Sequence, residues 1–273
     1  MNCRIVGKGE PLVLIHGWGM NSNVWNNIEA DLSKYFKLIM INLPGMGGCK
    51  LNNDYFMSSI VDSLNKFIPN NAILLGWSLG GQIAIAYQRR FPKKIKHLIL
   101  VSSTPCFINK KEWNCGVEKD IFEKFASQLI VNWKKTIHQF FLLQLYGVPN
   151  IRKVATKFEE TILSAGKPDP KALTLGLKLL LDTDCRENLI NINVKTLIIS
   201  GDKDRLTSLA SSKYMADIIP DSSLKIFPGA GHIPFLLEPE IFVQSILNFV
   251  KEKNCSYHNR NDTRKKAYKR HQP

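Results

Sequence analysis

Residues 73–84 read ILLGWSLGGQIA, and this stretch decides the fold. Three apolar residues lead into Gly-Trp-Ser-Leu-Gly, and residues at helical spacing follow at once. A G-x-S-x-G pattern in this setting is typical of a sharp turn from a strand into a helix, with the serine hydroxyl exposed at the turn. The free backbone N–H groups of the helix start then point at the reacting centre. We predict that Ser78 is a nucleophile; the alternative is an ordinary glycine-rich turn.

Strands and helices alternate on both sides of this turn. Uniformly apolar runs predict buried strands at residues 11–15, 38–43, 73–77, 95–102, 194–200 and 224–227. Apolar residues at helical spacing predict helices at residues 22–35, 55–68, 79–90, 211–219 and 241–250. This alternation predicts an α/β fold, in which a mostly parallel central sheet is covered by helices on both faces.

The pattern changes between residues 105 and 183, where we predict helices and no strand. Glycine and proline at residues 147–149 and 166–170 break these helices. We therefore predict a core built from residues 1–105 and 184–253, and an all-helical lid insertion at residues 106–183. Residues 254–273 form a polar, basic tail that we expect to be disordered.

The composition is that of a globular protein with excess positive charge. Of 273 residues, 44% are hydrophobic and 22% are charged, and the formal net charge is +14. No apolar run approaches the roughly 18 residues of a membrane span, and no signal-peptide core is found at the start. Six scattered cysteines without a C-x-x-C pair predict free thiols. We expect a cytoplasmic monomer that does not contact membranes.

Part of the positive charge lies in the tail, which carries six Lys or Arg residues and one Asp. Compositional drift in an AT-rich genome is one interpretation of this excess, and a function of the tail is the other. Nucleic acid is a possible acidic partner. We do not expect it here, because no RNP or zinc-finger pattern is present.

A serine nucleophile needs a base, and the base needs a carboxylate to orient it. The chain supplies these residues in the order Ser78, then Asp202 or Asp204, then His232. Each follows a predicted strand, and the loops after parallel strands gather at one edge of the sheet. We favour Asp204, because three residues after Gly201 leave room for a turn to aim it. Asp202 is better placed to cap that turn.

Attack on a carbonyl places negative charge on its oxygen, and one N–H donor aimed there is worth roughly 3 to 4 kcal/mol. Leu79, directly after the serine, offers one donor. Trp18, in the glycine-rich loop after the first buried strand, offers another, and its indole is a candidate wall for an acyl pocket. We expect His16 to support this loop.

Several segments resemble the α/β-hydrolase superfamily over residues 11–250, namely residues 16–19, 76–81, 201–204 and 231–234. Others resemble, within it, the pimeloyl-[acyl-carrier protein] methyl ester esterases of biotin synthesis, namely residues 14–21, 76–81, 102–107, 112–113 and 140–144. The chain departs from that family in its basic tail and in Asp202-Lys203 before the presumed acid. Neither departure removes a catalytic part.

The resemblance implies a serine carboxylesterase that converts pimeloyl-[acyl-carrier protein] methyl ester to the free carboxylate and methanol, with no cofactor and no metal. It implies Ser78, Asp204 and His232 as the catalytic triad. The substrate contacts that it implies are Trp18, Ser78, Leu79, Phe140, Phe141, Leu142, Leu143, Gln144 and His232.

The implied partner is an acyl-carrier protein, and carrier proteins of this kind are acidic. Basic residues of the insertion are candidates for its docking face, namely Lys134, Lys135, Arg152, Lys153 and Lys157. The alternative for each is a solvated charge without a partner.

Three other functions stay open. The first is a small-molecule carboxylesterase or C–C hydrolase that uses the same triad. The second is a catalytically silent binding protein, which predicts the loss of a triad residue, and none is lost. The third is association with nucleic acid through the tail.

Overall fold

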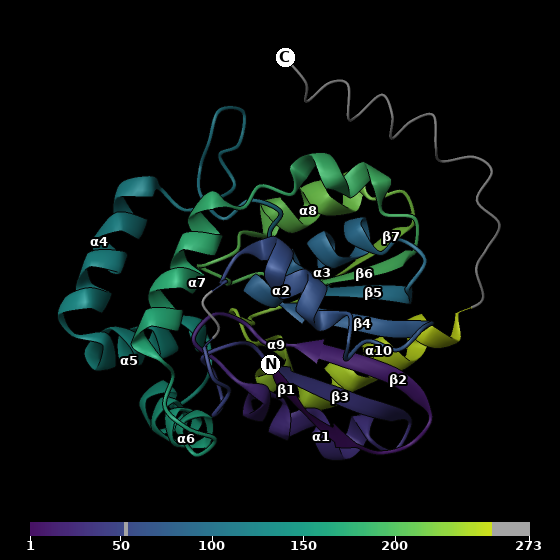
Figure 1. Ribbon diagram of the computed structural model, residues 1–273, viewed down its shortest axis with the longest axis horizontal. Coiled ribbons are helices and arrows are strands. Elements are labelled where there is room, and N and C mark those ends of the chain that lie inside the picture. Colours follow the sequence, from purple (N-terminus) through teal and green to yellow (C-terminus); the bar gives the residue numbers. More distant parts are fainter. Residues whose placement is uncertain (52–53, 253–273) are drawn as a thin grey trace.

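The computed structural model describes residues 1–51 and 54–252, which are organised around one seven-stranded sheet (Figure 1). The strands are β1 (Asn2–Val6), β2 (Glu10–Ile15), β3 (Phe36–Asn42), β4 (Ala72–Trp77), β5 (Ile95–Val101), β6 (Lys195–Gly201) and β7 (Ser222–Phe227). Their order is β1-β3-β2-β4-β5-β6-β7, and all neighbours are parallel except β1 and β3. The strand that leads into Ser78 is therefore the central one.

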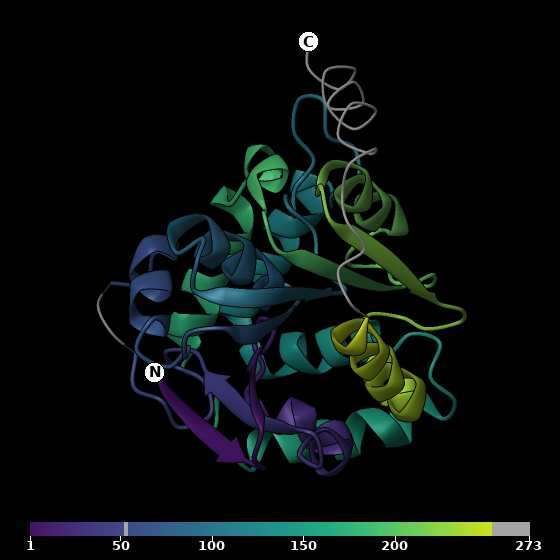
Figure 2. The same ribbon diagram turned by 90° about the vertical axis from the view of Figure 1, so that its right-hand side faces the viewer.

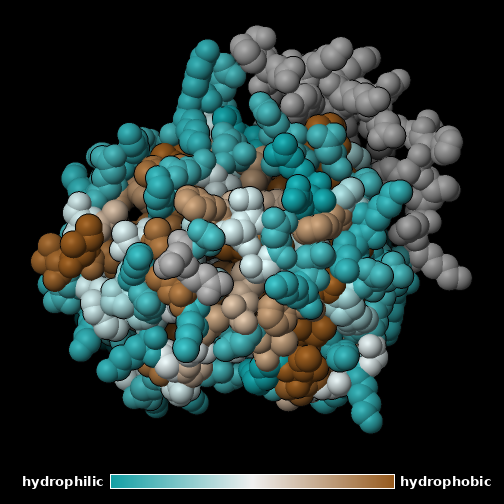
Figure 3. All heavy atoms as spheres, in the orientation of Figure 1, coloured by the Kyte–Doolittle hydropathy of each residue, from teal (hydrophilic) through white to brown (hydrophobic). Residues whose placement is uncertain are grey.

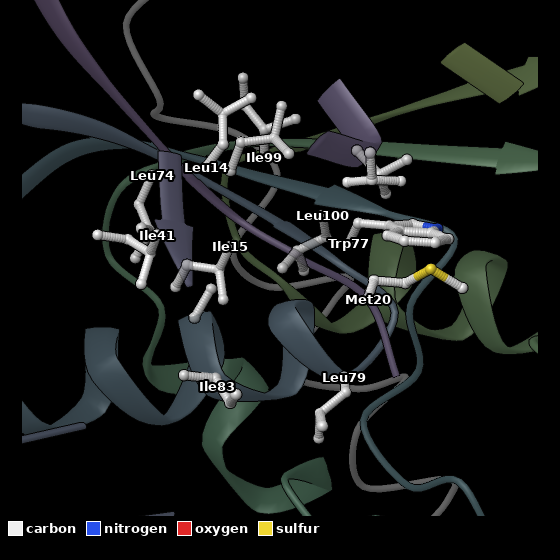
Figure 4. Close-up of a cluster of buried hydrophobic side chains, with 14 of the residues drawn as sticks. Leu14, Ile15, Met20, Ile41, Leu74, Trp77, Leu79, Ile83, Ile99 and Leu100 are labelled. Carbon is white, nitrogen blue, oxygen red and sulfur yellow. The ribbon is translucent and has the colours of Figure 1, made fainter. Parts of the chain in front are cut away.

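The inner strands are apolar along their length because both of their faces are covered. All six residues of β4 are buried. Leu14 and Ile15 of β2 point to opposite faces of the sheet, and Ile15 lies on the face toward Ile83 (Figure 4). All three side chains are fully buried.

Helices cover both faces of the sheet (Figures 1 and 2). One face carries α2 (Met57–Leu64), α3 (Leu79–Arg90) and α8 (Leu209–Ile218). The other carries α1 (Asn26–Leu32), α9 (Pro234–Leu237) and α10 (Pro239–Lys251). Two 3₁₀ helices, η1 (Ser22–Trp25) and η2 (Arg186–Asn191), complete the core.

Four helices form an insertion between β5 and β6. They are α4 (Lys119–Val131), α5 (Trp133–Gln144), α6 (Ile151–Leu163) and α7 (Pro170–Asp182). They lie together beside the carboxyl ends of the parallel strands (Figure 1). An isolated bridge between Cys106 and Asp184 joins the two ends of the insertion. The fold places the insertion over the edge where Ser78 lies.

The predicted α/β fold with its helical insertion is confirmed, but several elements of the core differ from the prediction, among them η2 and α9, which were not predicted. The helix predicted at residues 22–35 is a 3₁₀ turn followed by α1, which ends at Leu32. Strand β1 was not predicted, because this half-exposed edge strand pairs with one neighbour only and mixes polar with apolar residues. The tail at residues 254–273 lies outside the described residues.

In the described part of the chain, no helix is both long and apolar enough to cross a membrane. Exposed apolar side chains do occur on α4, where Ile130 and Val131 are 77% and 87% exposed. Figure 3 shows hydrophobic residues gathered at the side of the molecule where Figure 1 places α4 and α5.

Candidate active site

Ser78 occupies the sharp turn between β4 and α3. Its backbone has φ 56° and ψ −121°, a conformation that non-glycine residues rarely adopt. Three hydrogen bonds hold it there. Its N–H donates to the Val101 carbonyl at 3.0 Å, and its carbonyl accepts from the Gly81 N–H and the Ser103 hydroxyl, each at 2.9 Å. A strained residue that its surroundings fix in this way is a common feature of active sites.

The glycines around Ser78 permit the close approach that this turn needs. A Cβ on Gly76 would collide with the carbonyl oxygen of Gly80, and one on Gly80 would collide with the carbonyl oxygen of Ile15. The G-x-S-x-G spacing is therefore a packing requirement of β4, α3 and β2 at their point of contact.

His232 and Asp204 form a buried pair at the same edge of the sheet. Nδ1 of His232 lies 2.8 Å from Oδ2 of Asp204, and the side chains are 1% and 0% exposed. Oδ1 of Asp204 accepts from the N–H groups of Leu206 and Thr207, and the Thr207 hydroxyl donates to Oδ2 at 2.6 Å. This network fixes the carboxylate in one orientation.

The protonation of the pair follows from these contacts. Burial alone would raise the pKa of Asp204, but the charge of His232 and the hydrogen bonds from His232 and Thr207 lower it below its usual value. The carboxylate therefore accepts the Nδ1 proton, and Nε2 is left as the proton acceptor. Nε2 is buried and has no hydrogen-bond partner among residues 1–51 and 54–252.

Asp202, the alternative acid, has a different contact. Its carboxylate accepts from the N–H of Gly229 at 2.7 Å, and the residue is exposed. Of the two aspartates, Asp204 is therefore the one that contacts His232. Asp202 instead stabilises the loop that precedes His232.

The insertion and the central strand both hold the His232 loop. The His232 N–H donates to the carbonyl of Gln144, the last residue of α5, at 3.2 Å. The Trp77 indole donates to the His232 carbonyl at 2.9 Å, and the two rings lie 5.5 Å apart.

His16 fixes the loop after β2, as expected. The Leu43 N–H donates to its Nε2 at 3.1 Å, so Nδ1 carries the proton and donates to the Gly17 carbonyl at 2.8 Å. Complete burial lowers the pKa of His16 to about 4. A Cβ on Gly17 would lie 3.1 Å from the Ser78 Cβ, so this loop passes directly beside the serine.

The two predicted N–H donors belong to elements that meet at Ser78. Leu79 is the first residue of α3, where N–H groups have no partner inside the helix. Trp18 lies in the loop beside the serine, and its indole donates to the Leu173 carbonyl of α7 at 2.9 Å. Its ring contacts Phe140 edge-on at 4.9 Å and Phe125 at 5.6 Å. The indole thus joins the core to the insertion.

An apolar pocket of about 680 Å³, counting its open mouth, lies between Ser78 and the insertion. Its apolar walls are Trp18, Phe107, Val117, Ile121, Phe122, Phe125, Phe140, Leu143, Leu177, Leu180 and Leu206. Ser78 and Arg205 also line it. A pocket with this apolar lining suits an acyl chain.

Of the five consecutive residues 140–144 that were expected to contact substrate, the structure brings Phe140 and Leu143 to the pocket. Phe141 is fully buried and packs against Phe158 of α6, and Gln144 is buried beside the His232 loop. Leu142 is half-buried and does not line the pocket. Consecutive residues of a helix point in different directions, whereas residues three apart share a face.

Sequence reasoning missed most of the pocket wall. Ile121, Phe122 and Phe125 of α4 have helical spacing in the sequence, but that spacing does not say which face of the helix meets a ligand. Leu177 and Leu180 of α7 and Arg205 were not singled out. Proximity of Arg205 to the presumed acid was the one available signal.

The predicted docking residues are all exposed. Lys134 and Lys135 lie in the first turn of α5, and Arg152, Lys153 and Lys157 lie in the first half of α6. Within the described ranges, no group of three or more His, Cys, Asp or Glu side chains is placed to hold a metal ion.

Comparison with known proteins agrees with this architecture. Residues 10–239 match the model of the alpha/beta hydrolase fold family. The chain is 39% identical over 254 residues to a pimeloyl-[acyl-carrier protein] methyl ester esterase from Wigglesworthia glossinidia brevipalpis, covering 92% of this chain and 98% of that protein. It is 36% identical to the protein of the same name from Nitrosomonas europaea, covering 87% and 94%.

Solved structures share the fold. An esterase from Exiguobacterium antarcticum superimposes with a TM-score of 0.86 at 24% identity, covering 92% of this chain and 95% of that one. At this identity the likeness concerns the fold alone.

Proposed function

Because the chain belongs to the α/β-hydrolase fold family and is related to pimeloyl-[acyl-carrier protein] methyl ester esterases, we propose that it hydrolyses the methyl ester of a carrier-bound pimeloyl chain. The products are pimeloyl-[acyl-carrier protein] and methanol, and the reaction serves biotin synthesis. Ser78 is the nucleophile, His232 the base and Asp204 the orienting acid.

The observation that carries the proposal is the buried His232–Asp204 pair, whose Nε2 has no hydrogen-bond partner in the described part of the chain and lies at the same sheet edge as Ser78. Asp204 accepts the Nδ1 proton, so Nε2 can take the proton of the Ser78 hydroxyl as that oxygen attacks the ester carbonyl. The resulting imidazolium is stabilised by the Asp204 carboxylate, which is ionised at neutral pH.

Negative charge then develops on the carbonyl oxygen. The N–H groups of Leu79 and Trp18 are the donors that we assign to it, and each is worth roughly 3 to 4 kcal/mol in such a role. When the intermediate collapses, His232 returns the proton to the leaving oxygen and methanol departs. An acyl-Ser78 ester remains.

Water completes the reaction. His232 Nε2 takes a proton from a water molecule that attacks acyl-Ser78, and the second tetrahedral intermediate expels Ser78 with that proton. The product is a free carboxylate at the end of the acyl chain. Ser78 and His232 return to their starting protonation states, and the proposed reaction uses no cofactor.

The pocket supports an acyl substrate with an apolar chain. Its walls are nearly all apolar, and Phe140, Leu143 and Trp18 lie along it. The thioester that joins the chain to the carrier must survive, and positioning provides this selectivity when the carrier docks outside and the chain length decides which carbonyl reaches Ser78. The exposed basic residues of α5 and α6 complement an acidic carrier.

The test is a comparison of two substrates at equal enzyme concentration. Pimeloyl-[acyl-carrier protein] methyl ester should be hydrolysed with a higher kcat/KM than p-nitrophenyl acetate, and mass spectrometry should show loss of the methyl group with the thioester intact. Cleavage of the short ester alone would indicate a small-molecule carboxylesterase and contradict the carrier-bound substrate.

A further inference from the structure

Among the described residues that line the acyl pocket, Arg205 is the one that carries a charge. It directly follows Asp204, and both Arg205 and Tyr146 are exposed, which places them at the rim. The guanidinium carbon lies 3.6 Å from the centroid of the Tyr146 ring. The cation is therefore stacked on an aromatic face at the entrance of an apolar cavity.

This cation has no acidic partner in the described part of the chain. No Asp or Glu oxygen there lies within 4.0 Å of its guanidinium nitrogens. The neighbouring Asp204 carboxylate is occupied by His232, by Thr207 and by two backbone N–H groups. An unneutralised cation beside a low-dielectric cavity attracts an anion that enters it.

Stacking on Tyr146 also prepares the guanidinium for a planar ligand. A guanidinium presents parallel N–H donors that match the two oxygens of a carboxylate, and the stack leaves those edge donors free. Because the ring fixes the plane, less side-chain entropy is lost when an anion binds.

We propose that Arg205 selects esters whose far end is a carboxylate, so that the protein also hydrolyses free half-esters of dicarboxylic acids. The scissile ester lies at Ser78, the alkyl chain lies against the apolar walls, and the far carboxylate pairs with Arg205. This inference rests on the ester hydrolysis proposed for Ser78, and does not require the carrier.

The kinetic test compares monomethyl and dimethyl esters of the same dicarboxylic acid, over chains of increasing length. The two substrates differ only in the charge of the far end. Loss of one charge-assisted contact corresponds to about a ten- to hundredfold change. Arg205→Gln should therefore lower kcat/KM by that factor for the monomethyl ester, and leave the dimethyl ester nearly unchanged. The effect should peak at one chain length and weaken at high salt.

Variants at two other residues serve as controls. Lys203→Gln removes the same charge two residues away, from an exposed position that does not line the pocket. It should leave the ratio of the two substrates unchanged. Tyr146→Phe keeps the ring and should behave like the unaltered protein, whereas Tyr146→Ala should lose part of the preference.

Equal losses on both esters, no loss on either, or the same loss in Lys203→Gln would overturn the inference. Calorimetric titration of the monomethyl ester into Ser78→Ala, with and without Arg205→Gln, measures how much Arg205 contributes to binding when no turnover occurs. Cleavage of the monomethyl ester that depends on Arg205, without cleavage of the carrier-linked ester, would support the inference while the proposed function fails. Cleavage of neutral esters without a preference for the anion would do the reverse.

Discussion

The main-chain N–H of His232 donates to the carbonyl oxygen of Gln144, across 3.2 Å, and so ties the proposed base to the last residue of helix α5. The same helix lines the acyl pocket through Phe140 and Leu143. One helix of the insertion therefore contacts the proposed base and also forms part of the pocket wall. Displacement of α5 would move His232 as well as the pocket.

Gly231 makes this connection testable, because a Cβ at that position would collide with the carbonyl oxygen of Tyr146. We expect Gly231→Ala to push the His232 loop away from the insertion. Misplacement of a catalytic group by about 1 Å costs on the order of a hundredfold in rate. Steady-state kinetics on p-nitrophenyl acetate should show the loss in kcat.

Gly229→Ala is the matched control two residues earlier. A Cβ there would meet no atom of the described residues within 4 Å, although its φ of +75° disfavours alanine. It should cost about 1 kcal/mol of stability with a much smaller change in kcat. Equal losses of kcat in both variants would argue against the role of the insertion contact.

Asp202 and Asp204 have different hydrogen-bond partners, so their substitutions should have different effects. Asp204→Asn should lower kcat by about 10⁴-fold, since the amide cannot hold the Nδ1–H tautomer of His232 as the carboxylate does. Asp202→Asn weakens only the contact with the Gly229 N–H and should cost about 1 kcal/mol of stability. Both variants are compared by kcat at pH 7 and by thermal unfolding. The opposite ranking of the two in kcat would assign the acid to Asp202.

The lowered pKa of His16 predicts how the stability of the protein depends on pH. Its pKa is about 4 in the folded protein against an ordinary value of 6.5, because burial disfavours the charged ring. Between these values the unfolded chain binds a proton that the folded chain does not, so the free energy of unfolding falls as the pH falls. The expected loss attributable to His16 is about 3 kcal/mol across that window.

Urea unfolding at pH 7 and pH 4.5 measures this loss. His16→Gln cannot take up the proton, so its stability should fall less over the same interval, although it starts lower. Parallel pH profiles for the two proteins would show that His16 is not the group responsible.

The proposed carrier docking predicts a loss that depends on the substrate. Lys134→Glu combined with Arg152→Glu should lower kcat/KM for the carrier-linked ester by about tenfold or more, mainly through slower association. Hydrolysis of p-nitrophenyl acetate should not change. The control variant reverses the charges of Lys37 and Lys93, which are exposed at the opposite edge of the sheet. An equal effect of the two pairs would indicate a general charge effect.

The core of the molecule could be predicted from sequence because its signals are local. Uniformly apolar strands, the glycines around Ser78 and the order of Ser78, Asp204 and His232 each follow from short segments. The edge strand β1 could not be predicted, since it lacks a continuous apolar run.

The pocket was less predictable because its walls come from distant segments. Phe125 of α4, Phe140 of α5 and Leu177 of α7 meet only after the insertion has packed on the core. Helical spacing identified these helices but not which face of each meets the ligand. The stacking of Arg205 on Tyr146 joins residues 59 positions apart and left no pattern in the sequence.

Covalent labelling tests the central claim, that His232 and Asp204 activate Ser78, most directly. A p-nitrophenyl phosphonate ester transfers its phosphonyl group to an activated serine and releases p-nitrophenol. We predict one equivalent of p-nitrophenol per chain, a matching mass increase on the peptide that contains Ser78, and labelling slowed by orders of magnitude in His232→Ala. Labelling of another residue, or an unchanged rate in His232→Ala, would contradict the account.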